Sequence, residues 1–294
     1  MLKNKKAFTI IELLVALAII GLLTSVIVIA TQNIREKAKV AKTLQYAGSL
    51  YRSMSDTAVA LWDFDDGSGI TAKDSSNNGY DSKLGEGSCA PGNESCPSWS
   101  NDTPQALVGA GAGKFSLYFN GSNFVYLTKN LVDSFTKITI SAWVKCMMTP
   151  TEGRAGIFAR NKDSAGGIIL IKPASTGIVR FGFYNAANVL KSVDSVKTIT
   201  DQKWHFITGT YNGSQLKIYI DGQLDNTPVS ASDNIPSVGS TITSSIGLFN
   251  PNVFTYDMFE GFIDEVHIYN SALTSFEVQK LYADGLGKHQ LAEK

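Results

Sequence analysis

Charged residues are few in this chain, and their shortage is the first clue to its organisation. They account for 18% of the 294 residues, below the roughly 25% that is usual for soluble domains. Hydrophobic residues make up 44%, which excludes a wholly disordered chain. This length with a low charge content predicts about two parts, one of them strongly apolar.

Basic residues are scarce outside the N-terminal segment. The first 56 residues carry eight basic and three acidic side chains, which leaves 18 basic against 23 acidic side chains in the rest of the chain. That larger part contains only three arginines, at Arg154, Arg160 and Arg180. A net negative charge with so few arginines argues against a nucleic-acid partner.

Cysteine is scarce too, and three cysteines exclude a scaffold built from disulfides. Cys89 and Cys96 enclose a loop of six residues, and outside the cytoplasm we expect them to form a short-loop disulfide. Three unpaired thiols remain the alternative, because connectivity cannot be read from sequence. We expect Cys146, at the end of a predicted strand, to be unpaired and half-buried as a small apolar residue.

One long hydrophobic run occupies the N-terminal part. Residues 8–30 contain a single charge, Glu12, and as a helix they would be about 34 Å long, against about 30 Å of bilayer hydrocarbon. A cleaved secretory signal peptide is the alternative, but its apolar region is shorter. We therefore expect a membrane span, with simple anchoring still open as its only role.

The residues around Glu12 form a recognisable motif. The sequence KAFTIIELLV, at residues 6–15, closely resembles the prepilin motif of type IV pilins and pseudopilins. In that family a membrane-bound prepilin peptidase cleaves before the Phe and methylates the new amine. The resemblance thus implies a leader at residues 1–7, cleavage between Ala7 and Phe8, and N-methylation of Phe8.

The resemblance also implies a role for Glu12 in assembly with other pilin subunits of the same or another kind. Cleavage creates an ammonium on Phe8, one helical turn before Glu12, so the amine of one subunit can neutralise the carboxylate of its neighbour. Removing one partner of a buried ion pair costs about 3–5 kcal/mol. The precursor would lie in the cytoplasmic membrane with its N-terminus in the cytoplasm, and the mature subunit in a filament at the cell surface.

The same helix is expected to continue beyond the membrane. No proline occurs before Pro91, and apolar residues recur at roughly helical spacing after the span. We predict one long helix over residues 8–56, with residues 8–30 in the membrane or in the filament core.

From residue 58 onward the pattern predicts an all-β structure. Asn212-Gly213 and Asp221-Gly222 are strong hairpin signals, and they predict a three-stranded meander with strands at residues 205–211, 215–220 and 223–224. Other short runs of β-branched and aromatic residues favour a sandwich, and they lie at 115–119, 124–128, 138–146, 156–160, 168–171, 179–183, 246–248 and 259–269.

A single helix is expected after these strands. Residues 274–277 read TSFE, which is a capping box, and Gly285 is expected to end the helix. We predict a β domain over residues 57–284 and a flexible tail at residues 285–294. The fold class is therefore α+β overall, with a long hydrophobic helix followed by an all-β sandwich.

A series of motifs in this part resembles the laminin-G-like, concanavalin-A-like jelly roll of bacterial surface proteins. The motifs occur in the expected order as WDFDDGSG (62–69), DSSNNG (74–79), LYFNG (117–121), ISAWVK (140–145), KWH (203–205), IYIDG (218–222) and GFIDEVHIYNSAL (261–273). Members of this family often bind Ca²⁺, and Asp65, Asp74 and Asp264 are the matching oxygen ligands. The alternative is that these aspartates only hydrogen-bond nearby backbone in turns.

Catalytic patterns are missing from the β part. Glu260, Asp264 and Glu265 include no pair of acids on alternate residues of one strand, as a glycoside hydrolase on this fold would place them. We therefore expect no enzyme but a pilin-like subunit whose head binds a glycan or a surface protein in adhesion. A singly anchored lectin-like protein that does not polymerise is the alternative, and a glycoside hydrolase is a weaker one.

Overall fold

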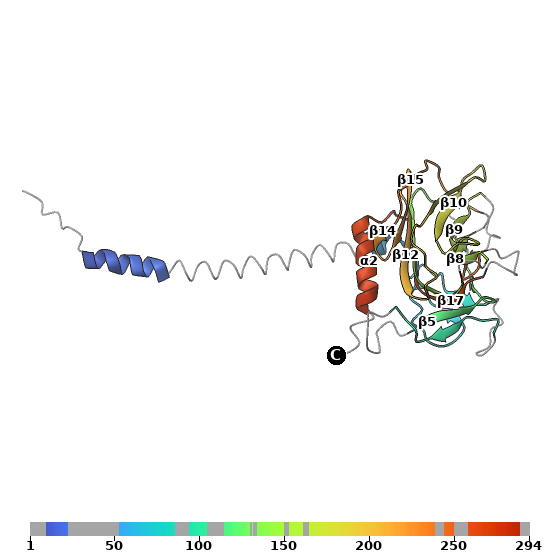
Figure 1. Ribbon diagram of the computed structural model, residues 1–294, viewed down its shortest axis with the longest axis horizontal. Coiled ribbons are helices and arrows are strands. Elements are labelled where there is room, and N and C mark those ends of the chain that lie inside the picture. The colour runs from blue at the N-terminus through green and yellow to red at the C-terminus, as the bar shows by residue number, and fades with distance from the viewer. Residues whose placement is uncertain are drawn as a thin grey trace, which may run out of the picture. The chain divides into compact units, whose positions relative to one another are not determined.

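The computed structural model describes ten ranges of the chain, which are residues 10–22, 53–85, 94–104, 115–129, 131, 134–149, 153–160, 165–238, 244–249 and 258–288. The chain divides into two compact units, Met1–Met54 and Ser55–Lys294. Figure 1 shows both units in one view, and each is considered below by itself.

The described part of the first unit is helical at residues 10–22. Its large apolar side chains are open, since Ile10, Ile11 and Leu22 are 70–79% exposed. Residues 53–57 are also helical. The structure therefore describes two stretches of the helix predicted over residues 8–56, and the residues between them lie outside the described ranges. Among the described residues, no helix has the length and hydropathy needed to cross a bilayer.

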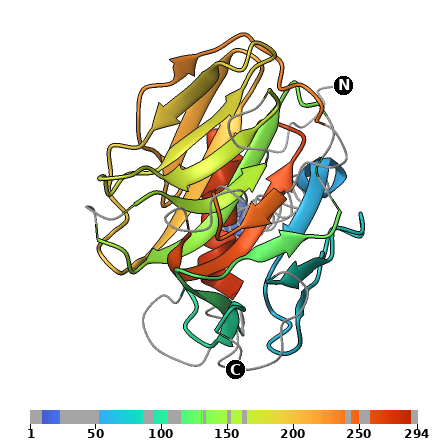
Figure 2. The same cartoon turned by 90° about the vertical axis from the view of Figure 1, so that its right-hand side faces the viewer.

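The second unit is a sandwich of two antiparallel sheets, as the alternating pattern predicted. The nine-stranded sheet has the order β14-β13-β12-β7-β17-β5-β4, with β1 paired to β17 and β15 paired to β13. Its strands are β1 (Ala58–Trp62), β4 (Ser98–Ser100), β5 (Ser116–Asn120), β7 (Ile138–Cys146), β12 (Trp204–Tyr211), β13 (Gln215–Ile220), β14 (Gln223–Leu224), β15 (Val229–Ser230) and β17 (Glu260–Tyr269). Figure 2 shows β17, in red, within this sheet.

The second sheet has eight strands in the order β11-β10-β9-β8-β16-β6-β3-β2. They are β2 (Thr71–Ala72), β3 (Ser82–Leu84), β6 (Val125–Leu127), β8 (Ala155–Arg160), β9 (Ile168–Lys172), β10 (Arg180–Tyr184), β11 (Leu190–Asp194) and β16 (Ser244–Ile246). The sequence pattern missed β1, β2, β3, β4, β11 and β15. Apart from β1, these strands are short or largely polar and show little alternation.

Alternation along each strand selects the side chains of the core between the sheets. In β5, Leu117 and Phe119 are fully buried in this core, whereas Tyr118 between them is only half-buried. Trp62 of β1 is also fully buried, and its Nε1 donates to the carbonyl of Tyr80 at 2.9 Å. Apolar burial on this scale, at about 25 cal/mol per Å², is the main favourable contribution to the stability of the sandwich.

The meander predicted from the two glycine-containing turns is present, but its two turns differ. Between β13 and β14, Asp221 (φ 54°) and Gly222 (φ 75°) both have the positive φ that a tight hairpin requires. Between β12 and β13 only Gly213 (φ 92°) does. There the side chain of Asn212 accepts hydrogen bonds from the backbone N–H groups of Ser214 and Gln215, at 3.0 and 2.8 Å, and forms a longer turn.

The C-terminal helix, α2 (Ser275–Lys288), begins at the predicted capping box. The backbone N–H of Thr274 donates to Glu277 Oε2 at 2.7 Å, and the N–H of Glu277 donates to Thr274 Oγ1 at 3.3 Å. The prediction that Gly285 ends the helix is wrong, because α2 continues to Lys288. The predicted tail therefore begins inside the helix, and residues 289–294 lie outside the described residues.

Gly285 has a different role, which is to let α2 approach the nine-stranded sheet. A Cβ at this position would lie 2.5 Å from Nε1 of Trp143, closer than a real Cβ contact allows. One turn away, Tyr282 stacks on Trp143 with 5.4 Å between ring centroids. Figure 1 shows α2 lying beside β12 and β14. A side chain on Gly285 would prevent this packing.

Candidate functional site

The residues of the prepilin motif lie at the start of the chain. Ala7 and Phe8, the two residues of the predicted cleavage site, lie outside the described residues. Glu12 lies in the helix at residues 10–22, where it is exposed. Its predicted contact with a neighbouring subunit stays a prediction.

Asp74, the second of the predicted calcium ligands, is committed to a turn. Its Oδ1 accepts hydrogen bonds from the backbone N–H groups of Leu61 and Ser76, at 3.0 and 2.9 Å, and its Oδ2 accepts one from Tyr80 at 3.0 Å. Burial opposes the charge, but the hydrogen bonds from Ser76, Leu61 and Tyr80 outweigh it and lower the pKa of Asp74. The alternative turn role therefore describes Asp74.

Asp264 has very different surroundings. It lies at a bulge of β17 and is 1% exposed. Its Oδ1 accepts a hydrogen bond from the backbone N–H of Glu265 at 2.8 Å, while its Oδ2 has no hydrogen-bond partner among the described residues. Burial raises the pKa of Asp264 well above its usual range, and the charges of Glu265, Asp65 and Asp63 raise it further. The neighbouring charges that act most strongly on this buried acid are therefore those of other acids.

Other polar groups surround Asp264, and two of them were missed from the sequence. His267, on the same strand, places Nε2 2.9 Å from Asp63 Oδ1. Asp65, the remaining predicted ligand, accepts a hydrogen bond from the backbone N–H of Phe115 at 3.4 Å. Asp63 follows β1 and lies in the same WDFDD motif as Asp65. This closeness in sequence to a predicted ligand could have identified Asp63.

The three predicted ligands do not form a single cluster. Throughout the described ranges, no three His, Cys, Asp or Glu side chains are placed to share a metal ion. Asp65 is coupled electrostatically to Asp264, whereas Asp74 uses its oxygens on the backbone. The donor chemistry of Asp65 and Asp264, with one orphaned buried oxygen, fits a hard cation such as Ca²⁺, and that of Asp74 does not.

A shallow pocket of about 410 Å³ lies in the loop that follows Asp65. It is lined by Asp65, Asp66, Ser68, Gly69, Ile70, Thr71 and Lys73. Lys73 Nζ lies 3.3 Å from Asp66 Oδ1, so these two charges neutralise each other, and the acid Asp65 also lines the pocket. The pocket is polar and open, and its described lining residues include no aromatic side chain.

The cysteines can be followed in part. Cys96 is disulfide-bonded, and Cys146 lies outside any disulfide, as predicted. Cys146 is fully buried, however, where the sequence predicted a half-buried side chain. Cys89, the predicted partner of Cys96, lies outside the described residues. The pairing of Cys89 with Cys96 stays a prediction.

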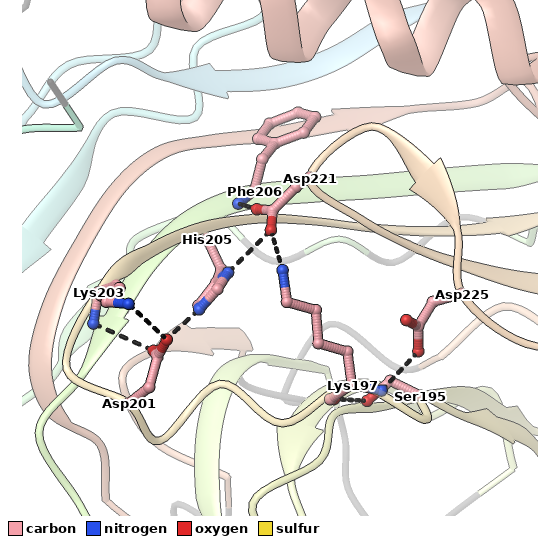
Figure 3. A network of polar contacts seen from close by, with 8 residues as sticks. All are labelled: Ser195, Lys197, Asp201, Lys203, His205, Phe206, Asp221 and Asp225. Carbon is pink, nitrogen blue, oxygen red and sulfur yellow. Dashed lines mark hydrogen bonds and ion pairs between the residues drawn. The ribbon is translucent and has the colours of Figure 1, made fainter. Parts of the chain in front are cut away.

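A second polar network surrounds His205, at the start of β12 (Figure 3). Its Nε2 lies 2.9 Å from Asp201 Oδ1, and its Nδ1 lies 3.0 Å from Asp221 Oδ2. Lys197 Nζ is 2.5 Å from the same Asp221 oxygen. The imidazole is thus held between two carboxylates, one in the loop before β12 and one in the β13–β14 turn.

The charges of this network support one another. Burial opposes protonation of His205, but the hydrogen bonds to Asp221 and Asp201 outweigh it and raise the pKa of His205 above its usual value. For both carboxylates burial again opposes the charge, and the hydrogen bond from His205 lowers the pKa. With both ring nitrogens committed, His205 connects two loops and has no nitrogen left for a metal ion.

Comparison with known families identifies both parts of the chain. The family model of the concanavalin A-like lectin/glucanases superfamily matches residues 119–279, more than half of the chain. The chain belongs to this superfamily. A model of the prokaryotic N-terminal methylation motif matches residues 2–28. The superfamily head thus follows a type IV pilin motif, as both resemblances in the sequence indicated.

Solved structures show the same fold at low sequence identity. The binding domain of Paraclostridial Mosquitocidal Protein 1 is similar with a TM-score of 0.57 and 18% identity over 79% of this chain. Domain 4 of AbnA, an extracellular arabinanase from Geobacillus stearothermophilus solved in complex with arabinotriose, has a TM-score of 0.53 and 20% identity over 77% of this chain. The binding domain of botulinum neurotoxin serotype G has a TM-score of 0.53 and 19% identity over 77% of this chain.

These relatives differ in how much of their own length is matched. The chain covers 98% of the arabinanase domain, but only about half of the two toxin binding domains, 53% and 51%. A search among curated proteins found no match. The superfamily assignment therefore rests on the family model and on the sandwich itself.

Proposed function

We propose that this protein is a type IV pilin-like filament subunit that displays a lectin-like head for adhesion. The observation that carries the proposal is the order of the two matches, because a methylation motif at residues 2–28 precedes a superfamily match at residues 119–279 in one chain. In type IV pilins such a motif marks a chain that is cleaved and assembled. The head then becomes the part that meets the surroundings.

The order of the motif and the head suggests how the subunit is inserted, cleaved and assembled. The precursor lies in the cytoplasmic membrane through residues 8–30, with its N-terminus in the cytoplasm, and prepilin peptidase cleaves between Ala7 and Phe8. The methylated amine of Phe8 then pairs with Glu12 of a neighbouring subunit in an apolar filament core. A buried ion pair of this kind selects partners, because a subunit that lacks one charge leaves the other uncompensated.

The decisive experiment compares two acid-to-alanine variants in the native host. Glu12→Ala should abolish incorporation into sheared surface filaments, while Glu36→Ala, which removes an acid outside the motif, should assemble as the wild type does. Intact mass and N-terminal sequencing of the filament subunit should show a chain that starts at methylated Phe8. Surface display of Glu12→Ala at wild-type level, with an uncut chain beginning at Met1, would instead establish a single-pass anchored protein.

We also propose that the head binds a glycan without turning it over. Support comes from the arabinanase domain of the same fold, which is nearly fully covered and was solved with arabinotriose. The acids of β17 that are closest in sequence, Asp264 and Glu265, are buried at 1% and 6% exposure, so a substrate on the surface does not reach them. Neutral oligosaccharides are the first ligands to test, by calorimetry with the detergent-solubilised full chain.

Calcium is a proposed structural cofactor of the head. The orphaned Oδ2 of Asp264 and the nearby Asp65 support this, whereas both carboxylate oxygens of Asp74 already accept hydrogen bonds from backbone N–H groups. When bound, Ca²⁺ would neutralise the buried charge of Asp264. Bound to both Asp65 and Asp264, the ion would then join the loop after β1 to β17.

A further inference from the structure

A row of aromatic side chains crosses the outward face of the nine-stranded sheet. Tyr118 of β5 pairs in register with Phe262 of β17, Phe262 pairs with Lys145 of β7, and Lys145 pairs with Trp204 of β12. The sequence neighbours Leu117, Val144 and Ile263 point into the core. Because side chains alternate along a strand, the four residues of the row lie on the opposite face.

The rings of this row contact one another. The Tyr118 and Phe262 centroids are 5.0 Å apart with 48° between the ring planes, and those of Trp204 and Phe262 are 6.2 Å apart with 50° between the planes. Lys145 Nζ lies 5.4 Å from the Phe262 centroid. The rings therefore form a continuous but twisted surface. Coplanar rings would instead suit the flat face of a crystalline polysaccharide.

Asp102 fixes the polar part of the row. Its Oδ2 lies 2.6 Å from Lys145 Nζ, and its Oδ1 accepts a hydrogen bond from Trp204 Nε1 at 2.9 Å. These contacts hold the lysine and the indole in place beside Phe262 before any ligand arrives, which reduces the entropic cost of binding. They also leave the row without net charge, so it complements an uncharged ligand with hydroxyl groups.

The helix α2 covers other aromatic residues on the same face of the sheet, but it leaves the row accessible. Trp143 and Phe206 lie two residues from Lys145 and Trp204 along their strands, hence on the same face. Tyr282 of α2 packs on both, with centroids 5.4 and 6.2 Å away, and both are only 2% exposed. The residues of the row are half-buried instead. Aromatic side chains thus continue beyond the helix onto accessible surface.

We propose that the row of Tyr118, Phe262, Lys145 and Trp204, with Asp102, is the glycan-binding site of the head and that its ligand is a neutral oligosaccharide. The proposal rests on the proposed function, in which the head binds glycans. Aromatic faces provide apolar area for the C–H face of a sugar ring, and the Lys145–Asp102 pair provides donors and acceptors for hydroxyl groups. This combination of apolar walls and a few placed polar groups is usual for small-ligand sites.

The test measures binding of arabinotriose, xylotriose and maltotriose to the detergent-solubilised full chain by calorimetry, with 3′-sialyllactose as an anionic comparison. Phe262→Leu keeps an apolar side chain but removes the ring, and Trp204→Ala removes the indole. Tyr184→Ala is the matched control, because Tyr184 is a half-buried aromatic residue of the eight-stranded sheet. Thermal unfolding of each variant checks that the fold is retained.

We expect the wild type to bind at least one neutral trisaccharide, both row variants to bind it at least tenfold more weakly, and Tyr184→Ala to bind as the wild type does. Wild-type binding that Phe262→Leu leaves intact would overturn the site but keep the glycan-binding function. Binding of the sialylated sugar alone would contradict the proposal that the ligand is neutral. No binding of any sugar would overturn both the site and glycan binding, and would leave filament assembly to its own test.

Discussion

Nδ1 of His205 lies 3.0 Å from Oδ2 of Asp221 and joins the start of β12 to the β13–β14 turn. His205 is only 4% exposed, and Asp201 occupies the other ring nitrogen at 2.9 Å. A protonated ring can donate to both carboxylates at once, while a neutral ring can donate to only one. The contact therefore depends on pH.

The first prediction concerns this dependence. The pKa of His205 is raised above its usual value near 6.5, so its stabilising contribution is complete below about pH 6.5 and is lost as the pH rises through the raised value. The pKa values of Asp201 and Asp221 are lowered, so their contribution is lost only as the pH falls below about 3.9. His205→Gln should therefore cost most between these limits, on the order of 1–3 kcal/mol.

Urea unfolding of the full chain at several pH values measures this difference. Lys203→Gln is the control, because Lys203 is exposed and lies 3.9 Å from Asp201. Its effect should be small and nearly independent of pH. A His205→Gln effect of equal size at pH values far below and far above the raised pKa would show that the charge plays no part.

The second prediction concerns the close approach of α2 to the sheet. Alanine normally favours a helix over glycine by about 1 kcal/mol, but a Cβ on Gly285 would lie 2.5 Å from Trp143 Nε1. We expect Gly285→Ala to lower the free energy of unfolding by about 1–3 kcal/mol. In a Trp143→Phe background, which removes the clashing atom, the same change should cost much less. A stabilised Gly285→Ala protein would contradict the close packing.

The third prediction concerns the cysteines. Cys146 is fully buried and Cys96 is disulfide-bonded, so the folded chain should resist alkylation. After denaturation without reductant, one thiol should react, and after reduction all three cysteines should react. Intact mass after each treatment counts the adducts. Three adducts without reductant would rule out the Cys89–Cys96 pair.

The fourth prediction concerns calcium. Excess Ca²⁺ should raise the melting temperature of the full chain above its value in EDTA, because a ligand that binds only the folded state stabilises it. Asp264→Asn should abolish this difference. Asp74→Asn should instead lower stability by the same amount with and without Ca²⁺, because Asp74 binds backbone N–H groups. Equal melting temperatures of the wild type in EDTA and in Ca²⁺ would contradict the proposal that Ca²⁺ is a cofactor.

Much of the fold could be predicted from the sequence. The limits of β7 and β13 were predicted to the residue, because both are long runs whose alternation or bounding turns are clear. The capping box at Thr274 placed the start of α2, and the motif around Glu12 agrees with the methylation model. These features are local, so neighbouring residues alone specify them.

Other features were not local and could not be predicted. Asp74 and Asp264 are the same residue type in equally suggestive motifs, yet one binds three backbone N–H groups and the other is buried with an orphaned oxygen. Gly285 has the sequence pattern of a helix end, but Trp143, which is distant in the sequence, makes a glycine necessary there.

By itself the sequence determined that a pilin-type segment precedes a β sandwich, because hydrophobic runs, alternation and turn residues act over a few positions. Only the tertiary structure decided which aromatic side chains face outward. Tyr118, Phe262 and Trp204 come from strands far apart in the sequence, and sheet pairing alone brings them into one row. Core and surface of a sandwich use the same aromatic residues, so their roles are set by what packs against them.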